Sequence, residues 1–130
     1  MEQTVEERNK ELLKDAARYR DHWGTLRQMT EYYGDKYANA LEKAKKGDPY
    51  ACCMLGQMFK ESICHAKEKY EYPISGYRQL TKIYYELAAN QGYAKGMYYL
   101  GNECFEDGEL EQAEKWLVKA AEEGITASCT

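Results

Sequence analysis

Cysteine and histidine give this 130-residue chain its greatest capacity for chemistry, because both residues bind metals and a cysteine thiolate is a strong nucleophile. The tightest grouping joins Cys64 and His65, with Cys52 and Cys53 upstream. Metal ligands normally lie two to four residues apart, whereas adjacent residues on a helix diverge by about 100°. A metal site is therefore disfavoured. A small thiol- or metal-dependent enzyme using Cys64 and His65 is the alternative hypothesis for function.

The cysteines predict reduced thiols. They number five, an odd count, at positions 52, 53, 64, 104 and 129, and the N-terminal sequence is acidic where a secretory signal would be basic and then apolar. We therefore expect a cytoplasmic protein whose thiols pack as small apolar side chains.

Other catalytic signatures are missing from the sequence. No serine stands in a Gly-x-Ser-x-Gly turn, no glycine-rich phosphate loop occurs, and His22 lies far from His65. The carboxylates fall mostly on amphipathic segments, where they form a solvated face. A net charge of −4 with dispersed lysines and arginines disfavours nucleic acid, and no apolar window is long enough for a bilayer. We expect no enzymatic activity, no cofactor, no metal, and neither a nucleic-acid nor a membrane partner.

Glycines divide the chain into a repeated unit that must position any functional side chain. Three alanine-containing segments, "ALEKAKKG", "YELAANQG" and "LVKAAEEG", end at Gly47, Gly92 and Gly124. A Leu-Gly pair follows the first two at the same distance, ending at Gly56 and Gly101. The sequence therefore contains one unit written at least twice.

Each unit is predicted to be a pair of helices. The first members cover residues 49–61 and 93–106, and the second members cover 77–90 and 110–122. Small residues let neighbouring helices approach closely, and large residues fill the space beside them. A unit of this kind must stack on a neighbour to bury its apolar face, so we expect an all-α fold, a short α-solenoid of antiparallel helix pairs. The predicted space-filling residues are Leu55, Phe59, Tyr84, Leu100, Phe105 and Trp116.

The repeated unit resembles the Sel-1-like repeats, relatives of the tetratricopeptide repeats. The resemblance implies two repeats over 47–124, a helical cap with a degenerate repeat over 1–46, and the start of a truncated further repeat at 125–130, all in one globular domain. In the family's cysteine-rich branch two cysteines eight residues apart are bridged, but Ala44 faces Cys52 here and Ala121 faces Cys129. Those disulfides cannot form. The residues that carry the resemblance are Gly92, Ala94, Gly96, Leu100, Gly101, Ala113, Trp116, Lys119, Ala120, Ala121 and Gly124.

The first 46 residues carry a helical pattern without the repeat signature. Thr4 and Glu7 form a capping box, and Gly24 and Gly34 are predicted to break the region into two or three helices. We expect an apolar stripe to cover the first face of the solenoid as a cap, with a coiled-coil partner surface as the alternative. The stripe consists of Leu12, Ala16, Tyr19, Trp23 and Leu26.

Residues outside the packing signature recur at the same places in both units and predict a partner-binding stripe. Their spacing of four and then three puts each set on one face of a first helix, and the resemblance implies that partners bind this concave surface. Tyrosine with amide side chains suits a protein interface. The alternative is that Met54 and Tyr99 simply pack against neighbouring helices. The stripe consists of Tyr50, Met54, Gln57, Lys95, Tyr99 and Asn102.

Two further surfaces complete the functional hypothesis. The segment 61–76 is predicted to be a long binding loop bearing His65, Tyr70 and Tyr72, although its glutamates and lysines would also suit a continued helix. The open C-terminal face is a candidate for a homodimer. We expect a non-enzymatic module that binds a protein partner, acting as a small inhibitor, immunity protein or adaptor.

Overall fold

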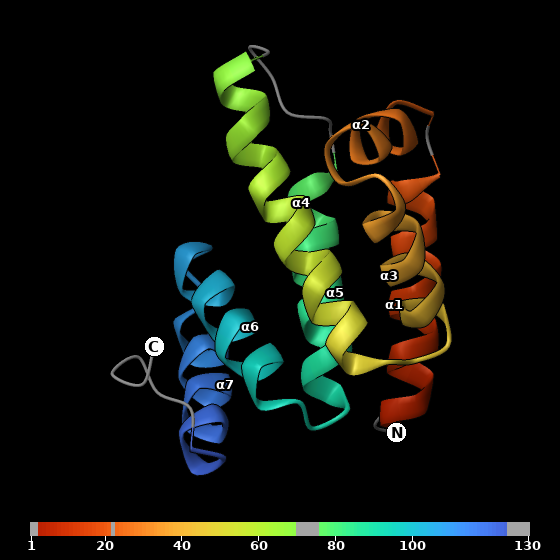
Figure 1. The fold of residues 1–130 in the computed structure, drawn as a ribbon. Coiled ribbons are helices and arrows are strands. Elements are labelled where there is room, and N and C mark those ends of the chain that lie inside the picture. Colours follow the sequence, from red (N-terminus) through yellow and green to blue (C-terminus); the bar gives the residue numbers. More distant parts are fainter. Residues whose placement is uncertain (1–2, 22, 70–75, 125–130) are drawn as a thin grey trace.

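All the regular secondary structure in the described part of the chain is helical. The computed structural model describes residues 3–21, 23–69 and 76–124, with the backbone alone at 23–24 and 64–69, and no strand occurs in these ranges. The predicted all-α class is confirmed. The helices, shown in Figure 1, are α1 Val5–Arg20, α2 Trp23–Tyr33, α3 Asp35–Lys45, α4 Pro49–Lys69, α5 Tyr77–Asn90, α6 Ala94–Glu106 and α7 Leu110–Glu122.

Glycine ends the repeated helices, as the sequence pattern predicts. After α5 the amide of Gly92 donates to Ala89 O at 3.0 Å, and the amide of Tyr93 donates to Ala88 O at 3.2 Å. This pair of bonds requires a left-handed residue, and Gly92 has φ +85°. The helices predicted at 77–90 and 110–122 have those bounds in the structure, and the one predicted at 93–106 begins one residue later.

The long loop predicted at 61–76 is wrong over its first nine residues, because α4 continues to Lys69. No glycine or proline interrupts residues 57–72, so nothing in the sequence stops the helix. Helix α2 also covers the start of this extension. The buried Ser62 donates to Met58 O at 2.9 Å and lies against the sulfur of Met29, and Tyr33 donates to Glu61 at 2.9 Å. Tyr70 and Tyr72 lie outside the described residues.

Successive helices pack against one another in chain order from α3 to α7, and α1 packs against α5 (Figure 1). The contact between α4 and α5 recurs between α6 and α7. A Cβ added at Gly56 would meet the Tyr85 ring and the carbonyl of Thr81, and one added at Gly101 would meet Leu117 and the carbonyl of Ala113. Gly101 takes the place of Gly56 in the second unit. The residues that it contacts on α7, Ala113 and Leu117, take the places of Thr81 and Tyr85 on α5. The two helix pairs are therefore equivalent in packing as well as in sequence.

Replacing Gly96 with alanine is expected to destabilise the protein by about 1–3 kcal/mol, and Gly101→Ala by less. A Cβ at Gly96 would lie 2.7 Å from the Ala88 Cβ and 2.9 Å from the Ala89 nitrogen, and this backbone cannot move aside. At Gly101 the nearest atom, 2.7 Å away, belongs to the Leu117 side chain, which can change rotamer. Both variants gain the same helix propensity. Urea denaturation compares them, and equal losses would contradict the close approach of α5 and α6.

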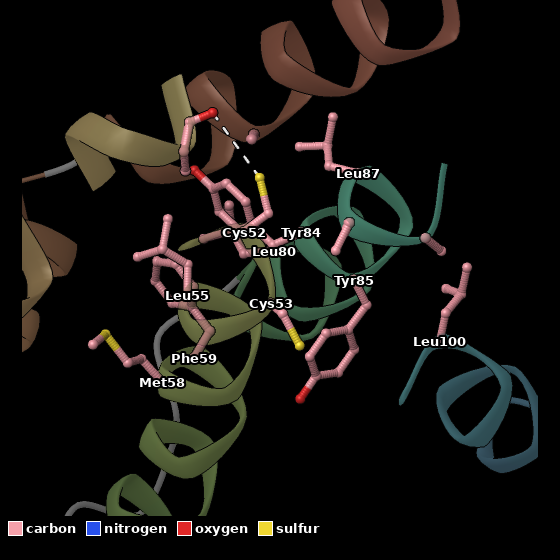
Figure 2. Close-up of a cluster of buried hydrophobic side chains, with 14 of the residues drawn as sticks. Cys52, Cys53, Leu55, Met58, Phe59, Leu80, Tyr84, Tyr85, Leu87 and Leu100 are labelled. Atoms are coloured by element: carbon pink, nitrogen blue, oxygen red, sulfur yellow. Dashed lines mark hydrogen bonds between the residues drawn. The ribbon is translucent and has the colours of Figure 1, made fainter. Parts of the chain in front are cut away.

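The core is an aromatic and aliphatic cluster centred on α4 and α5 (Figure 2). Phe59 is fully buried among rings of α3 and α5, as predicted, and Leu55, Tyr84 and Leu100 are buried as well. Phe105 was predicted to fill space in the same way, which is wrong, because its side chain is 63% exposed. It lies at the end of α6 on a face that no described helix covers.

The N-terminal helices follow the predicted pattern only in part. The side chain of Thr4 caps α1 by accepting from the Glu7 amide at 3.1 Å, and Gly34 separates α2 from α3. Gly24, however, lies inside α2, because α1 ends at Arg20 and α2 already begins at Trp23. That break ends the predicted apolar stripe. Its first two residues are buried, but Tyr19 is partly exposed, Leu26 is 60% exposed, and the Trp23 side chain lies outside the description.

Polar contacts fix α1 on α5. Arg8 forms a bidentate ion pair with Glu86, at 2.8 and 3.1 Å, and Asn90 donates to Asn9 at 3.1 Å. The hydrogen bond with Glu86 outweighs burial and raises the pKa of Arg8. These contacts join the start of the chain to a helix far along the sequence, so α1 belongs to the same packed unit as the repeats.

Candidate functional site

The predicted partner-binding stripe lies on the two equivalent first helices, α4 and α6, and starts with an aromatic pair. Tyr50 is 58% exposed at the beginning of α4, and its ring meets Tyr93 edge to face with the centroids 6.4 Å apart. Lys95 is exposed on the first turn of α6. Met54, one turn beyond Tyr50, is partly buried and packs against the core. This end of the stripe therefore combines exposed and packed side chains.

The other three stripe residues meet at one hollow of about 300 Å³ between α4 and α6. Gln57 of α4 faces Tyr99 and Asn102 of α6 there, with Tyr85 of α5 in the lining. The rings of Tyr99 and Tyr85 stack with centroids 5.3 Å apart and planes 26° apart. Tyr99 thus packs against its neighbour and still lines the hollow, so its two predicted roles are compatible.

An ion pair defines the rim of this hollow. Lys60 contacts Glu103 directly and Glu106 at 3.5 Å, bridging α4 and α6. Burial disfavours the charge of Lys60, but the hydrogen bond and the charges of the two glutamates outweigh it and raise the pKa of the ammonium group. Lys60 therefore stays charged well above neutral pH. The hollow offers a ligand amide groups, an aromatic edge and a fixed charge pair.

The three described thiols do not add a nucleophile to this surface. Cys52, Cys53 and Cys104 are free and buried, as predicted for reduced cysteines that pack as small apolar residues. Burial raises the pKa of Cys52 to about 12 and of Cys53 to about 11, and it also raises the pKa of Cys104. A thiol with such a pKa is protonated at neutral pH and is a poor nucleophile.

The remaining cysteine and histidine predictions fall outside the described side chains. Cys64 and His65 lie on the α4 extension, where the backbone alone is described, and His22 and Cys129 are outside the described residues. Across the described side chains, no three residues of the metal-ligating types come together as a metal centre would need.

Sequence reasoning missed a second, larger hollow than the one between α4 and α6. It measures about 720 Å³ and lies between α1, α5 and α7, with Leu12, Ile83 and Trp116 among its lining residues. The ammonium groups of Lys115 and Lys119 lie 5.4 and 5.0 Å from the centre of the Trp116 ring. This hollow exists because α1 docks on α5. The repeat pattern gives no sign of that contact, because α1 is not part of a repeated unit.

Comparisons of the chain with protein-family models, curated proteins and solved structures found no match. The resemblance to Sel-1-like repeats therefore rests on the residues quoted above. Among the described helices none combines the length and the apolar sequence needed to cross a membrane.

Proposed function

We propose that this protein is a non-enzymatic protein-interaction module with the architecture of a short Sel-1-like α-solenoid. The architecture is supported by the repeated contact in which Gly56 packs on α5 and Gly101 packs on α7. Stacked helix pairs of this kind present their first helices on one continuous surface. The binding surface in this proposal is the one formed by α4 and α6.

The observation that carries the proposal is the hollow between α4 and α6. Three residues that the repeat pattern selects, Gln57, Tyr99 and Asn102, line this single hollow although Gln57 lies far from the other two in sequence. Tyr50 extends the same two-helix surface with an exposed ring. Amide groups can hydrogen-bond a peptide backbone, and rigid tyrosine rings supply apolar area at little entropic cost.

The chemistry of the surface favours a protein ligand that approaches as an extended or irregular segment. Gln57 and Asn102 each offer both a donor and an acceptor, which matches the exposed backbone groups of such a segment. The high pKa values of the buried Cys52 and Cys53 disfavour these two thiols as nucleophiles. A small module that covers part of another protein would act as an inhibitor, an immunity protein or an adaptor.

A triple variant, Tyr50→Ala with Gln57→Ala and Asn102→Ala, is expected to lower the recovery of the protein partner at least about tenfold, because it removes an exposed ring and both amides. None of these side chains is fully buried, so the fold should persist. The measurement is a tagged pull-down from the native source with quantitative mass spectrometry, beside Tyr19→Ala as a control at another partly exposed ring. Equal recovery by both variants, or no partner with the unaltered protein, would contradict the proposal.

A further inference from the structure

The outer face of α7 and the end of α6 form an apolar groove that no other described helix covers. The groove measures about 440 Å³ and is lined by Phe105, Leu110, Leu117 and Val118, with Glu114 as its charged residue. Leu110 and Val118 are 60% and 50% exposed, and Phe105 is more exposed still. Large apolar side chains gathered in this way mark an interaction surface more often than scattered ones do.

The equivalent face of the preceding helix pair shows what kind of element covers such a groove. On α5 that face is occupied by α6, whose Gly96 lies against Ala88 and Ala89. Both alanines are buried there. The offset that relates α5 to α7 maps Ala88 onto Ala120, which is buried, and Ala89 onto Ala121, which is exposed. The groove on α7 therefore has the form of a helix-binding site that no described helix occupies.

Charged residues show that a helix bound in this groove would need side chains different from those of α6. In the internal contact Lys60 forms an ion pair with Glu103, and Lys82 forms one with Glu109. The repeat offsets map Lys60 onto Phe105 and Lys82 onto Glu114. One cation is thus replaced by an aromatic ring and the other by a carboxylate.

These replacements specify the side chains that the groove accepts. The residue of a bound helix that contacts Phe105 should be apolar. A carboxylate there would lose its hydration and would have no cation to pair with, because Phe105 stands in the place of Lys60. The position that meets Glu114 should be basic. A helix with the acidic pattern of α6 would be rejected on both counts.

We propose that this groove binds an amphipathic helix of another protein, with a glycine or alanine over Ala121, an apolar residue over Phe105 and a basic residue beside Glu114. The surface differs from the α4 and α6 surface of the proposed function, and its test is independent. The internal α5 and α6 contact supplies the geometry, and the exchanged side chains supply the specificity. Binding would place a helix on α7 in the way that α6 lies on α5.

Two stapled peptides test this specificity. The first has the sequence of residues 93–109, and the second carries Glu103→Leu and Glu109→Lys in the same sequence. A staple reduces the cost of forming an isolated helix. The second peptide is expected to bind the full chain at least about tenfold more tightly than the first, which corresponds to about 1.4 kcal/mol. Backbone chemical shifts of the isotope-labelled protein, titrated under reducing conditions, should change along α7 and the end of α6.

Matched variants of the protein locate the binding. Val118→Lys is expected to weaken the second peptide at least about tenfold, while Leu26→Lys, an equally drastic change at an exposed apolar residue of α2, should leave it unchanged. Equal binding of the two peptides, no binding, or shift changes away from α7 would overturn the proposal. A concentration-dependent dimer that Val118→Lys abolishes, measured by sedimentation, would assign the groove to a second copy of this chain and overturn it as well.

Discussion

Alkaline solution is expected to unfold this protein completely between about pH 9 and pH 11.5, while it stays folded near neutral pH. The cause is the set of buried thiols and phenols in its core. Burial raises the pKa of Cys52 to about 12 and of Cys53 to about 11, from an ordinary value of 9.0. It also raises the pKa values of Tyr37, Tyr77 and Tyr84 above the ordinary 10.0.

The sign of the effect follows from which state releases protons first. A raised pKa means that the folded protein holds its protons where the unfolded chain has lost them, so the stabilising contribution is complete below the unfolded pKa and falls as the pH rises above it. Each group then loses about 1.4 kcal/mol per pH unit until its folded pKa is reached. Summed over the buried thiols and phenols, the loss near pH 11 is on the order of 10 kcal/mol, the whole stability of a typical domain.

Two spectroscopic measurements check this prediction. Circular dichroism follows the helices, and ultraviolet absorbance follows ionisation of the 13 tyrosines. The buried phenols should ionise together with the loss of helix. The double variant Tyr37→Phe with Tyr77→Phe keeps both rings but removes two ionisable groups, and its midpoint should rise by about 0.3 pH unit. A helical protein at pH 11.5, or an unchanged midpoint in the variant, would contradict the assignment.

Phe59→Ala is expected to lower the free energy of unfolding by about 3–5 kcal/mol. The Phe59 ring is fully buried at the point where α3, α4 and α5 meet. It lies edge-on to Tyr37 and Tyr77, with centroids 6.0 and 5.1 Å away, and parallel to Tyr84 at 6.0 Å. Alanine would leave a cavity and remove three ring contacts, which the rigid helices around it cannot refill.

The chain supplies its own control, because its only other phenylalanine, Phe105, is mostly exposed. The same replacement at Phe105 should change the stability by no more than about 0.5 kcal/mol. Urea denaturation gives the midpoint concentration for each variant. The midpoints report stability directly if the free energy of unfolding depends equally on urea concentration in both variants. Similar losses at the two positions would show that Phe59 is not the centre of the core.

The repeated region was predictable because its signals are local. Gly92 ends α5 through a left-handed conformation that the sequence alone suggests, and the bounds of α5 and α7 follow from such glycines. The length of α4 was left open, because the absence of glycine and proline over residues 57–72 permits a continued helix without requiring one. The contacts of Met29 and Tyr33 with the start of this extension come from a helix that the repeat pattern does not include.

The candidate site was likewise predictable only where the sequence signal is local. Spacing alone placed Gln57, Tyr99 and Asn102 on neighbouring helix faces, and the structure puts them around one hollow. Spacing could not show that Tyr99 stacks on Tyr85, since that contact depends on the distance between α5 and α6. It also could not show that Phe105 is exposed, because a periodic pattern marks a face as apolar without saying what covers it.

The contact of α1 with α5 has a consequence for the order in which the chain assembles. The hydrogen bonds from Arg8 to Glu86 and from Asn90 to Asn9 join residues 78 and 81 positions apart. During synthesis α1 leaves the ribosome long before α5 exists. Until α5 is made, the apolar residues of α1 that α5 will cover stay exposed to solvent or bound to a chaperone. The repeats pair with close sequence neighbours and should form faster, because closing a long loop is slow. Among the described helices, α1 is therefore made first and is expected to dock last.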